Sequence, residues 1–293
     1  MNILKKTGSI LFCFLPVLLA LGIQIIVTFA SVIVRMLALI VGGSALFTDS
    51  SLANVEQAMA SLSNDSQFLT LVSIIYAVLA AIALGLWYRL RFVPKHMPRR
   101  SLGELVNLPM IVGLVLLMVG MQYLSTYMVA MLAAVNHSWF DTYQGMMESI
   151  GFDDITPLLA LYTVFVAPIS EELIFRGVTL KYAARAMPFF LANIFQALLF
   201  GAFHGNIVQG AYAFVAGLFC GYVCYKGGSL WLSILLHMMF NLWGAFAPDF
   251  LSYAGSSTIL HLFILVLSIL FSAGGAFLYQ KGASMRKSSA TVR

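Results

Sequence analysis

The chain has 293 residues, of which 61% are hydrophobic and only 9% are charged. This composition excludes a soluble globular domain and predicts a polytopic membrane protein. The net charge of +5 does not indicate nucleic-acid binding, because the basic residues flank the apolar segments. All three cysteines (Cys13, Cys220 and Cys224) lie in apolar runs, so we expect buried thiols and neither a disulfide framework nor a zinc knuckle.

Eight apolar runs of near membrane length follow one another along the chain. In lipid every backbone amide must be satisfied within its own segment, so each run is expected to be a helix. The first run is too long for a signal peptide and no clear cleavage site follows it, which favours a retained span. The sequence therefore predicts an all-α bundle of about eight transmembrane helices, forming one integral membrane domain over residues 1–293. The expected spans are 10–37, 68–87, 108–134, one that begins at residue 157, 189–204, 208–225, 230–246 and 259–279.

The connecting segments differ in charge from one side to the other. Residues 44–67 and 135–155 contain acidic residues but neither Lys nor Arg, whereas residues 89–100 contain five basic residues. Both ends of the chain are also basic. By the positive-inside rule this asymmetry predicts that both termini are cytoplasmic. On the sixth span, Ala213, Gly217 and Gly221 form a ridge of small residues that would allow a neighbouring helix to approach closely.

The fourth span carries two adjacent carboxylates, Glu171 and Glu172. A central acidic residue costs about 2.5–3.5 kcal/mol on insertion scales, so an intramembrane pair indicates a functional site. Arg176 lies one helical turn after Glu172 and can pair with it, whereas Glu171 points about 100° away and needs another partner. Pro168 supplies no amide, so we expect the Val164 carbonyl to lose its helical donor. The resulting kink could open a cavity, although transmembrane prolines are also tolerated without such a role.

Three further polar residues belong to apolar runs. His204 ends the fifth span, while His237 and Asn241 lie four residues apart in the seventh, on one helix face. If the fourth and fifth spans form a hairpin that turns at residues 187–188, Glu171 and His204 both lie about 25 Å from the turn. These two side chains could then face each other. Any one of these residues could simply hydrogen-bond between helices, but their combination indicates a site.

These blocks read E-E-x-x-x-R, F-x-x-x-H and H-x-x-x-N, in that order. They resemble the CAAX protease and bacteriocin-processing (CPBP) family, also called Abi or type II CAAX endopeptidases. The resemblance covers residues 157–245, and the three-span region within residues 1–150 carries no signature. It implies an intramembrane endopeptidase in the plasma membrane of a bacterium, with a bacteriocin, a leader peptide or a CAAX-type C-terminus as substrate. The positions that it implies for the site are Glu171, Glu172, Arg176, His204, His237 and Asn241.

A carboxylate in a cavity of low dielectric constant can act as a general base toward water. We assign this role to Glu171, with His204 holding the same water. His237 and Asn241 are expected to donate hydrogen bonds to the oxyanion. Glu172 and Arg176 are interpreted as a structural pair, although Glu172 could share the catalytic load.

Two alternatives stay open at this stage. Glutamate and two histidines could hold a divalent metal such as zinc, and the base would then be Glu172. The resemblance implies no tightly held metal, so we expect no cofactor. The second alternative is a proton-coupled transporter or a membrane scaffold that uses the same buried Glu and His cluster. A transporter usually shows inverted repeats, and none is evident in the sequence.

Overall fold

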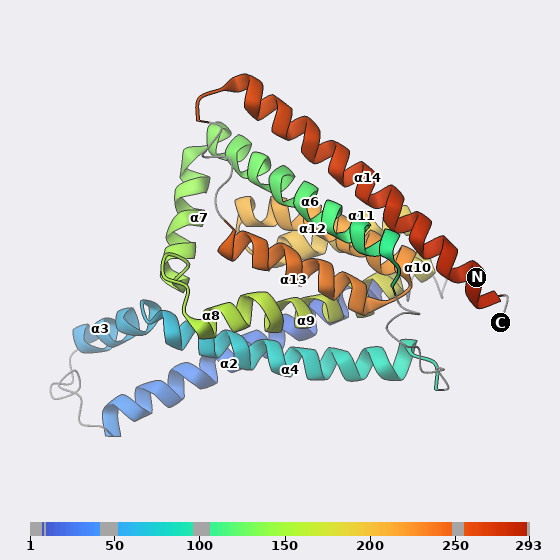
Figure 1. Cartoon of the computed structure of the whole chain (residues 1–293). Coiled ribbons are helices and arrows are strands. Elements are labelled where there is room, and N and C mark those ends of the chain that lie inside the picture. The colour runs from blue at the N-terminus through green and yellow to red at the C-terminus, as the bar shows by residue number, and fades with distance from the viewer. Residues whose placement is uncertain (1–7, 9, 42–51, 96–105, 248–254, 292–293) are drawn as a thin grey trace.

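The computed structural model describes residues 8, 10–41, 52–95, 106–247 and 255–291. Within them the chain is helical and contains no strand, and eight apolar helices cross the bundle in alternating directions (Figure 1). Six are long enough to span a membrane, and α11 and α13 are shorter apolar helices. The protein is thus the predicted all-α polytopic membrane bundle. The eight are α2 (Leu15–Val41), α4 (Ser66–Phe92), α6 (Leu108–Val135), the segmented helix Pro157–Ala186, α11 (Phe189–Phe203), α12 (Ile207–Gly227), α13 (Leu230–Phe246) and α14 (Thr258–Thr291).

Two more helices occupy the acidic segments, where the sequence predicted only loops. They are α3 (Leu52–Ser63) and α7 (His137–Ile150), and both lie at one end of the bundle (Figure 1). The Asn136 side chain accepts a hydrogen bond from the Ser138 amide and so caps the beginning of α7. Gly151 ends α7 with a φ of 96°, a left-handed conformation that favours glycine.

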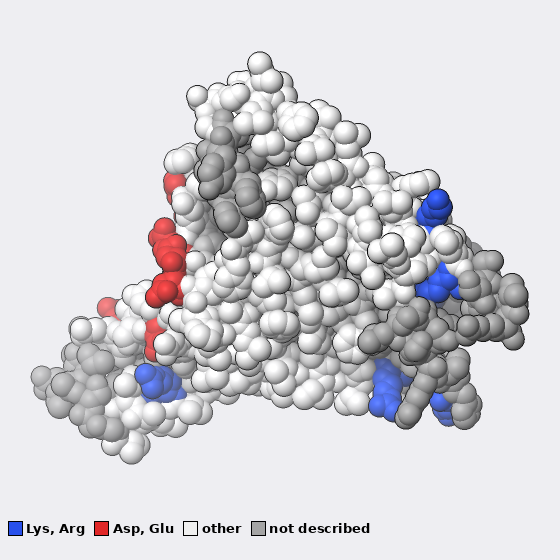
Figure 2. Space-filling view, in the orientation of Figure 1, with Lys and Arg blue, Asp and Glu red and all other residues white. Residues whose placement is uncertain are grey.

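Charge separates the two ends of the bundle (Figure 2). The described acidic surface residues gather at the end with α3 and α7, and most Lys and Arg residues gather at the opposite end. One basic residue departs from this pattern, because Arg35 lies 3.9 Å from Asp65, the residue that caps the beginning of α4. The beginning of α2 and the end of α14 both lie at the basic end (Figure 1).

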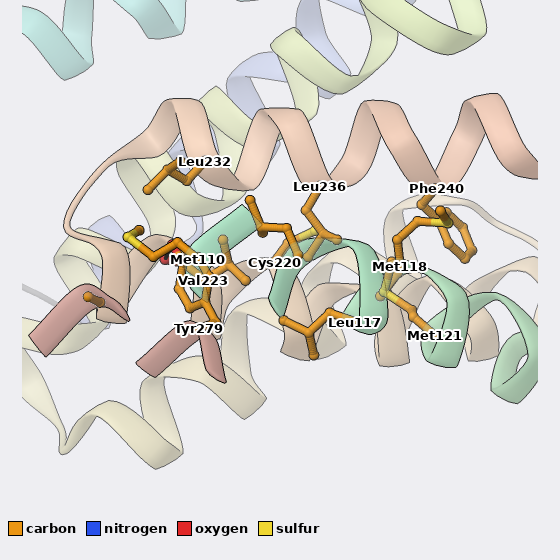
Figure 3. Close-up of a cluster of buried hydrophobic side chains, with 13 residues drawn as sticks. Met110, Leu117, Met118, Met121, Cys220, Val223, Leu232, Leu236, Phe240 and Tyr279 are labelled. Atoms are coloured by element: carbon orange, nitrogen blue, oxygen red, sulfur yellow. Dashed lines mark hydrogen bonds between the residues drawn. The ribbon is translucent and has the colours of Figure 1, made fainter. Parts of the chain in front are cut away.

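The largest buried apolar cluster joins α6, α12, α13 and α14 (Figure 3). Its fully buried members include Leu117, Leu236 and Tyr279, and the Tyr279 hydroxyl donates to the Val223 carbonyl at 2.9 Å. α6 and α14 approach so closely that a Cβ added at Gly275 would lie 2.7 Å from the Leu117 amide nitrogen. Packing of small residues at helix contacts is a main source of association in lipid, where the hydrophobic effect is absent.

The predicted small-residue ridge of α12 packs against α11. A Cβ added at Gly217 would lie 3.0 Å from the Ala197 Cβ, and the Gln196 side-chain amide donates to the Gly217 carbonyl at 2.9 Å. The close helix approach that the ridge predicted is therefore confirmed. Met187 and Pro188 break the helix between the fourth and fifth spans, which confirms the predicted turn.

Candidate active site

The fourth span changes its helical register twice along its length. It consists of α8 (Pro157–Leu161), the π-helix η2 (Tyr162–Val166), α9 (Ala167–Glu172), the π-helix η3 (Leu173–Thr179) and α10 (Leu180–Ala186). π-helical turns insert one extra residue and are frequent at functional sites. Both glutamates lie in α9, between the two π-helical segments.

The first π-turn decides which carbonyl Pro168 leaves free. The Ala167 amide donates to the Tyr162 carbonyl, five residues back, and Pro168 has no amide to offer Thr163. The Asn241 side-chain amide supplies the missing donor, with its Nδ2 atom 2.8 Å from the Thr163 carbonyl oxygen. The sequence predicts that Pro168 frees the Val164 carbonyl, as in a regular α-helix. In the structure the carbonyl that takes a side-chain donor is that of Thr163, one residue earlier, because the π-turn shifts the hydrogen-bond register by one residue.

Glu172 and Arg176 form the predicted ion pair. Arg176 Nη1 lies 2.7 Å from Glu172 Oε1, and both side chains are fully buried. The Arg176 guanidinium also stacks over the Phe200 ring, 4.4 Å from its centroid. A buried charge is tolerated only with a partner of this kind, so each member of the pair depends on the other.

His237 contacts both glutamates through its two ring nitrogens. Its Nδ1 lies 3.0 Å from Glu172 Oε1, and its Nε2 lies 3.7 Å from Glu171 Oε2. An ionised carboxylate only accepts hydrogen bonds, so Nδ1 carries the hydrogen that is donated to Glu172. The other ring nitrogen, Nε2, faces Glu171. The 100° separation predicted entirely different partners for the two carboxylates, but they share His237, and Arg176 pairs with Glu172 alone.

His204 follows the last turn of α11, where its Nδ1 lies 2.9 Å from the Phe200 carbonyl oxygen. A carbonyl can only accept, so Nδ1 is the donor and the Nε2 of the neutral ring is an acceptor. The Phe200 ring packs edge-on against both His204 and His237, with centroid distances of 4.9 and 5.8 Å. Phe200 therefore positions several polar groups of the site. Its place as the first residue of F-x-x-x-H was the only sign of this in the sequence.

A cavity of about 580 Å³ brings four predicted site residues together. Its lining includes Glu171, His204, His237 and Asn241, whereas Glu172 and Arg176 lie behind the wall. The side chain of Glu171 is 17% exposed, and the side chain of Glu172 is fully buried. The arrangement separates one accessible carboxylate from one that holds the histidine in place.

The donor geometry does not fit the metal alternative well. Among the described residues, the one group of three potential ligands whose atoms all lie within 4.8 Å of one another is Glu172, Cys220 and His237. That group is not the predicted Glu, His and His set. Its carboxylate Oε1 already contacts Arg176 Nη1 and His237 Nδ1, and the guanidinium charge opposes a divalent cation at the same place.

Residues 154–243 match the family described as Rce1-like, the type II CAAX prenyl endopeptidases. The matched region contains all six predicted site residues. An Escherichia coli protein described as an uncharacterized 24.3 kDa protein is 36% identical over 87 residues. That alignment covers 28% of this chain and 40% of the relative, so the chain spans less than half of the length of the curated protein that it matches. No solved structure matches the chain significantly.

Proposed function

We propose that the chain is an intramembrane endopeptidase with a water activated by Glu171, and the match of residues 154–243 to the Rce1-like type II CAAX prenyl endopeptidases supports this proposal. The observation that carries this proposal is the lining of the cavity. Glu171, His204, His237 and Asn241 converge there from three different helical spans. A base, a water-binding group and two hydrogen-bond donors are the parts that peptide hydrolysis requires.

Glu171 acts as the general base in this mechanism. A water between Glu171 and His204 donates one hydrogen to the carboxylate and one to the free Nε2 of His204. Its oxygen then attacks the scissile carbonyl carbon while the proton moves to Glu171. After the tetrahedral intermediate forms, the C–N bond breaks and Glu171 returns this proton to the leaving amine.

His237 and Asn241 stabilise the oxyanion of the intermediate. In its imidazolium form His237 donates to Glu172 through Nδ1 and toward the cavity through Nε2. The Asn241 amide nitrogen carries two hydrogens, so one remains available after the bond to Thr163. Loss of one oxyanion donor typically slows an enzyme by about 10²–10³-fold.

Glu172 and Arg176 act as positioning residues. The bond from His237 Nδ1 to Glu172 fixes the orientation of the imidazole, and Arg176 holds the carboxylate that makes this bond. The zinc alternative would require Glu172 as the base, yet Glu172 is fully buried and already paired. We therefore propose a mechanism without a resident metal.

The cavity lies in the half of the bundle nearest to α7. Its lining uses the later residues of α6 and α13 and the earlier residues of α4 and α12, all at the acidic end. With both termini cytoplasmic in a bacterial plasma membrane, this end faces the outside. We accordingly favour a leader peptide, a bacteriocin or a membrane protein as the substrate over a cytoplasmic CAAX-type C-terminus.

The test compares Glu171→Gln with the wild-type protein and with Glu148→Gln, which alters an exposed acid on α7. Each protein is purified, reconstituted in liposomes and incubated with internally quenched peptides. We expect Glu171→Gln to lose at least about 100-fold in cleavage rate while it keeps its melting temperature, because the base is lost without a change of shape. Equal cleavage by Glu171→Gln and wild type would overturn the proposal.

A further inference from the structure

One face of α7 forms part of the wall of the catalytic cavity. Tyr143, Met146, Met147 and Ile150 all line it, and their i, i+3, i+4, i+7 spacing is that of a single helix face. These four side chains are partly buried, whereas residues between them on the helix, such as Gln144 and Glu148, are exposed. α7 lies outside residues 154–243, so the family match does not include this wall.

Several contacts hold α7 over the cavity. The Tyr143 ring packs edge-on against the Tyr212 ring of α12, with centroids 6.2 Å apart, and Tyr212 also lines the cavity. Caps at Asn136 and Gly151 define both ends of the helix. α7 also packs against α4 and α6, so its inner face is a fixed part of the wall.

The chemistry of this face differs from that of the catalytic wall. Glu171, His204, His237 and Asn241 supply polar atoms for the reaction, whereas α7 contributes two methionines, one isoleucine and one aromatic ring. Methionine is flexible and polarizable, and it adapts to apolar partners of different shape. A protease selects its substrate by the pocket that receives a substrate side chain.

We infer that the inner face of α7 is the subsite that binds an apolar side chain of the peptide substrate and sets the size that is accepted. The inference rests on the proposed endopeptidase function. Filling the subsite should exclude large side chains, and emptying it should admit them better. A change of one methylene in such a pocket shifts the specificity constant by about 10–200-fold.

The experiment uses Met147→Trp, which fills the subsite, and Met147→Ala, which enlarges it. Gln144→Trp is the matched control, because it adds the same side chain to the exposed face of the same helix. The probes are internally quenched peptides that share one parent sequence. At each position in turn, the parent residue is replaced by Gly, Ala, Val, Leu, Phe or Trp. Cleavage sites are assigned by mass spectrometry, and every variant is also made with Glu171→Gln.

We expect one peptide position at which Met147→Trp lowers kcat/KM for Phe and Trp at least about 10-fold more than it lowers kcat/KM for Gly and Ala. At that position Met147→Ala should shift the preference toward the larger residues, and Gln144→Trp should match the wild type. If cleavage depends on Glu171 but both Met147 variants keep the wild-type size profile, this inference is overturned alone. If no peptide is cleaved in a Glu171-dependent way, the proposed function falls, and the inference with it.

Discussion

Asn241 on α13 donates its side-chain amide to the backbone carbonyl of Thr163, at a distance of 2.8 Å. This bond joins the seventh span to the π-turn that precedes Pro168. It supplies the donor that the proline lacks, so the irregular backbone of the fourth span is satisfied by another helix. Because Glu171 follows three residues after Pro168, the same contact helps to fix the direction in which this carboxylate points.

The first prediction tests this coupling. Asn241→Ala should lower the stability by about 0.5–2 kcal/mol, since a transmembrane hydrogen bond is lost and a carbonyl is left unpaired. Adding Pro168→Ala should restore part of that loss, because this substitution brings a backbone amide to the turn. Melting temperatures of the two single variants and the double variant in detergent measure the effect. If the decreases in melting temperature of the two single variants simply add up in the double variant, the coupling is refuted.

The second prediction concerns the buried ion pair. Arg176→Met should cost about 3–5 kcal/mol, because it removes the guanidinium that pairs with the fully buried Glu172. Combining it with Glu172→Leu should recover much of this stability, since an apolar pair of similar volume replaces the ion pair. Activity should stay low in the double variant, because His237 has lost the carboxylate that orients it.

Denaturation in detergent and peptide cleavage are measured side by side for these variants. Lys181→Ala, at an exposed position further along the same span, serves as the control and should change neither quantity. Full recovery of cleavage in the double variant would show that Glu172 does not position His237.

The third prediction uses two adjacent glycines of α14. A Cβ added at Gly275 would lie 2.7 Å from the Leu117 amide nitrogen and 2.9 Å from the Gly113 carbonyl oxygen, whereas one added at Gly274 would meet nothing within 4 Å. Gly275→Ala should therefore separate α6 from α14 and lower the melting temperature. Gly274→Ala should be neutral or slightly stabilising, because alanine favours the helix. Similar melting temperatures for the two variants would contradict the close packing.

The fold was largely predictable because lipid imposes one rule on every span. Apolar length predicted the eight helices, and the absence of Lys and Arg from residues 44–67 and 135–155 predicted the acidic end. The charge pattern of residues 135–155 predicts the side of the membrane but not a helix, so α7 was not predicted from it. The apolar spacing of Tyr143, Met146, Met147 and Ile150 was present in the sequence and would have indicated an amphipathic helix.

Four of the six residues predicted for the site line one cavity, but most of the contacts that they make were not predicted. The spacing of four predicted the pairing of Glu172 with Arg176, because both belong to one helix. The bonds of His237 to Glu172 and of Asn241 to Thr163 join different spans, so no local spacing encodes them. The π-helix η2 was not predicted either, and with its register the carbonyl that takes the side-chain donor is that of Thr163, one residue before the predicted Val164.

The fourth prediction concerns orientation in the membrane. Single cysteines are placed at Ser63, Asn136, Ser256 and Ser288, in a background where the three buried native cysteines are replaced by alanine. A membrane-impermeant maleimide applied to intact cells should label the first three, because they lie at the acidic end or in the loop after the seventh span. Ser288 lies near the end of α14, directly after Arg286 and Lys287, and should react only after permeabilisation. Labelling of Ser288 in intact cells would reverse the orientation.

The last prediction concerns metal. If Glu171 activates water directly, cleavage should survive strong chelators, and active protein should contain no stoichiometric zinc. His237→Ala should then lower turnover by about 10²–10³-fold, as expected for an oxyanion donor, without changing the metal content. If the histidines are ligands, His204→Ala and His237→Ala should each lose metal together with activity. Elemental analysis of active protein beside His237→Ala separates the two mechanisms. One zinc per active chain that is absent from the variant would refute the direct mechanism, whereas the existing bonds of Glu172 to Arg176 and His237 lead us to expect none.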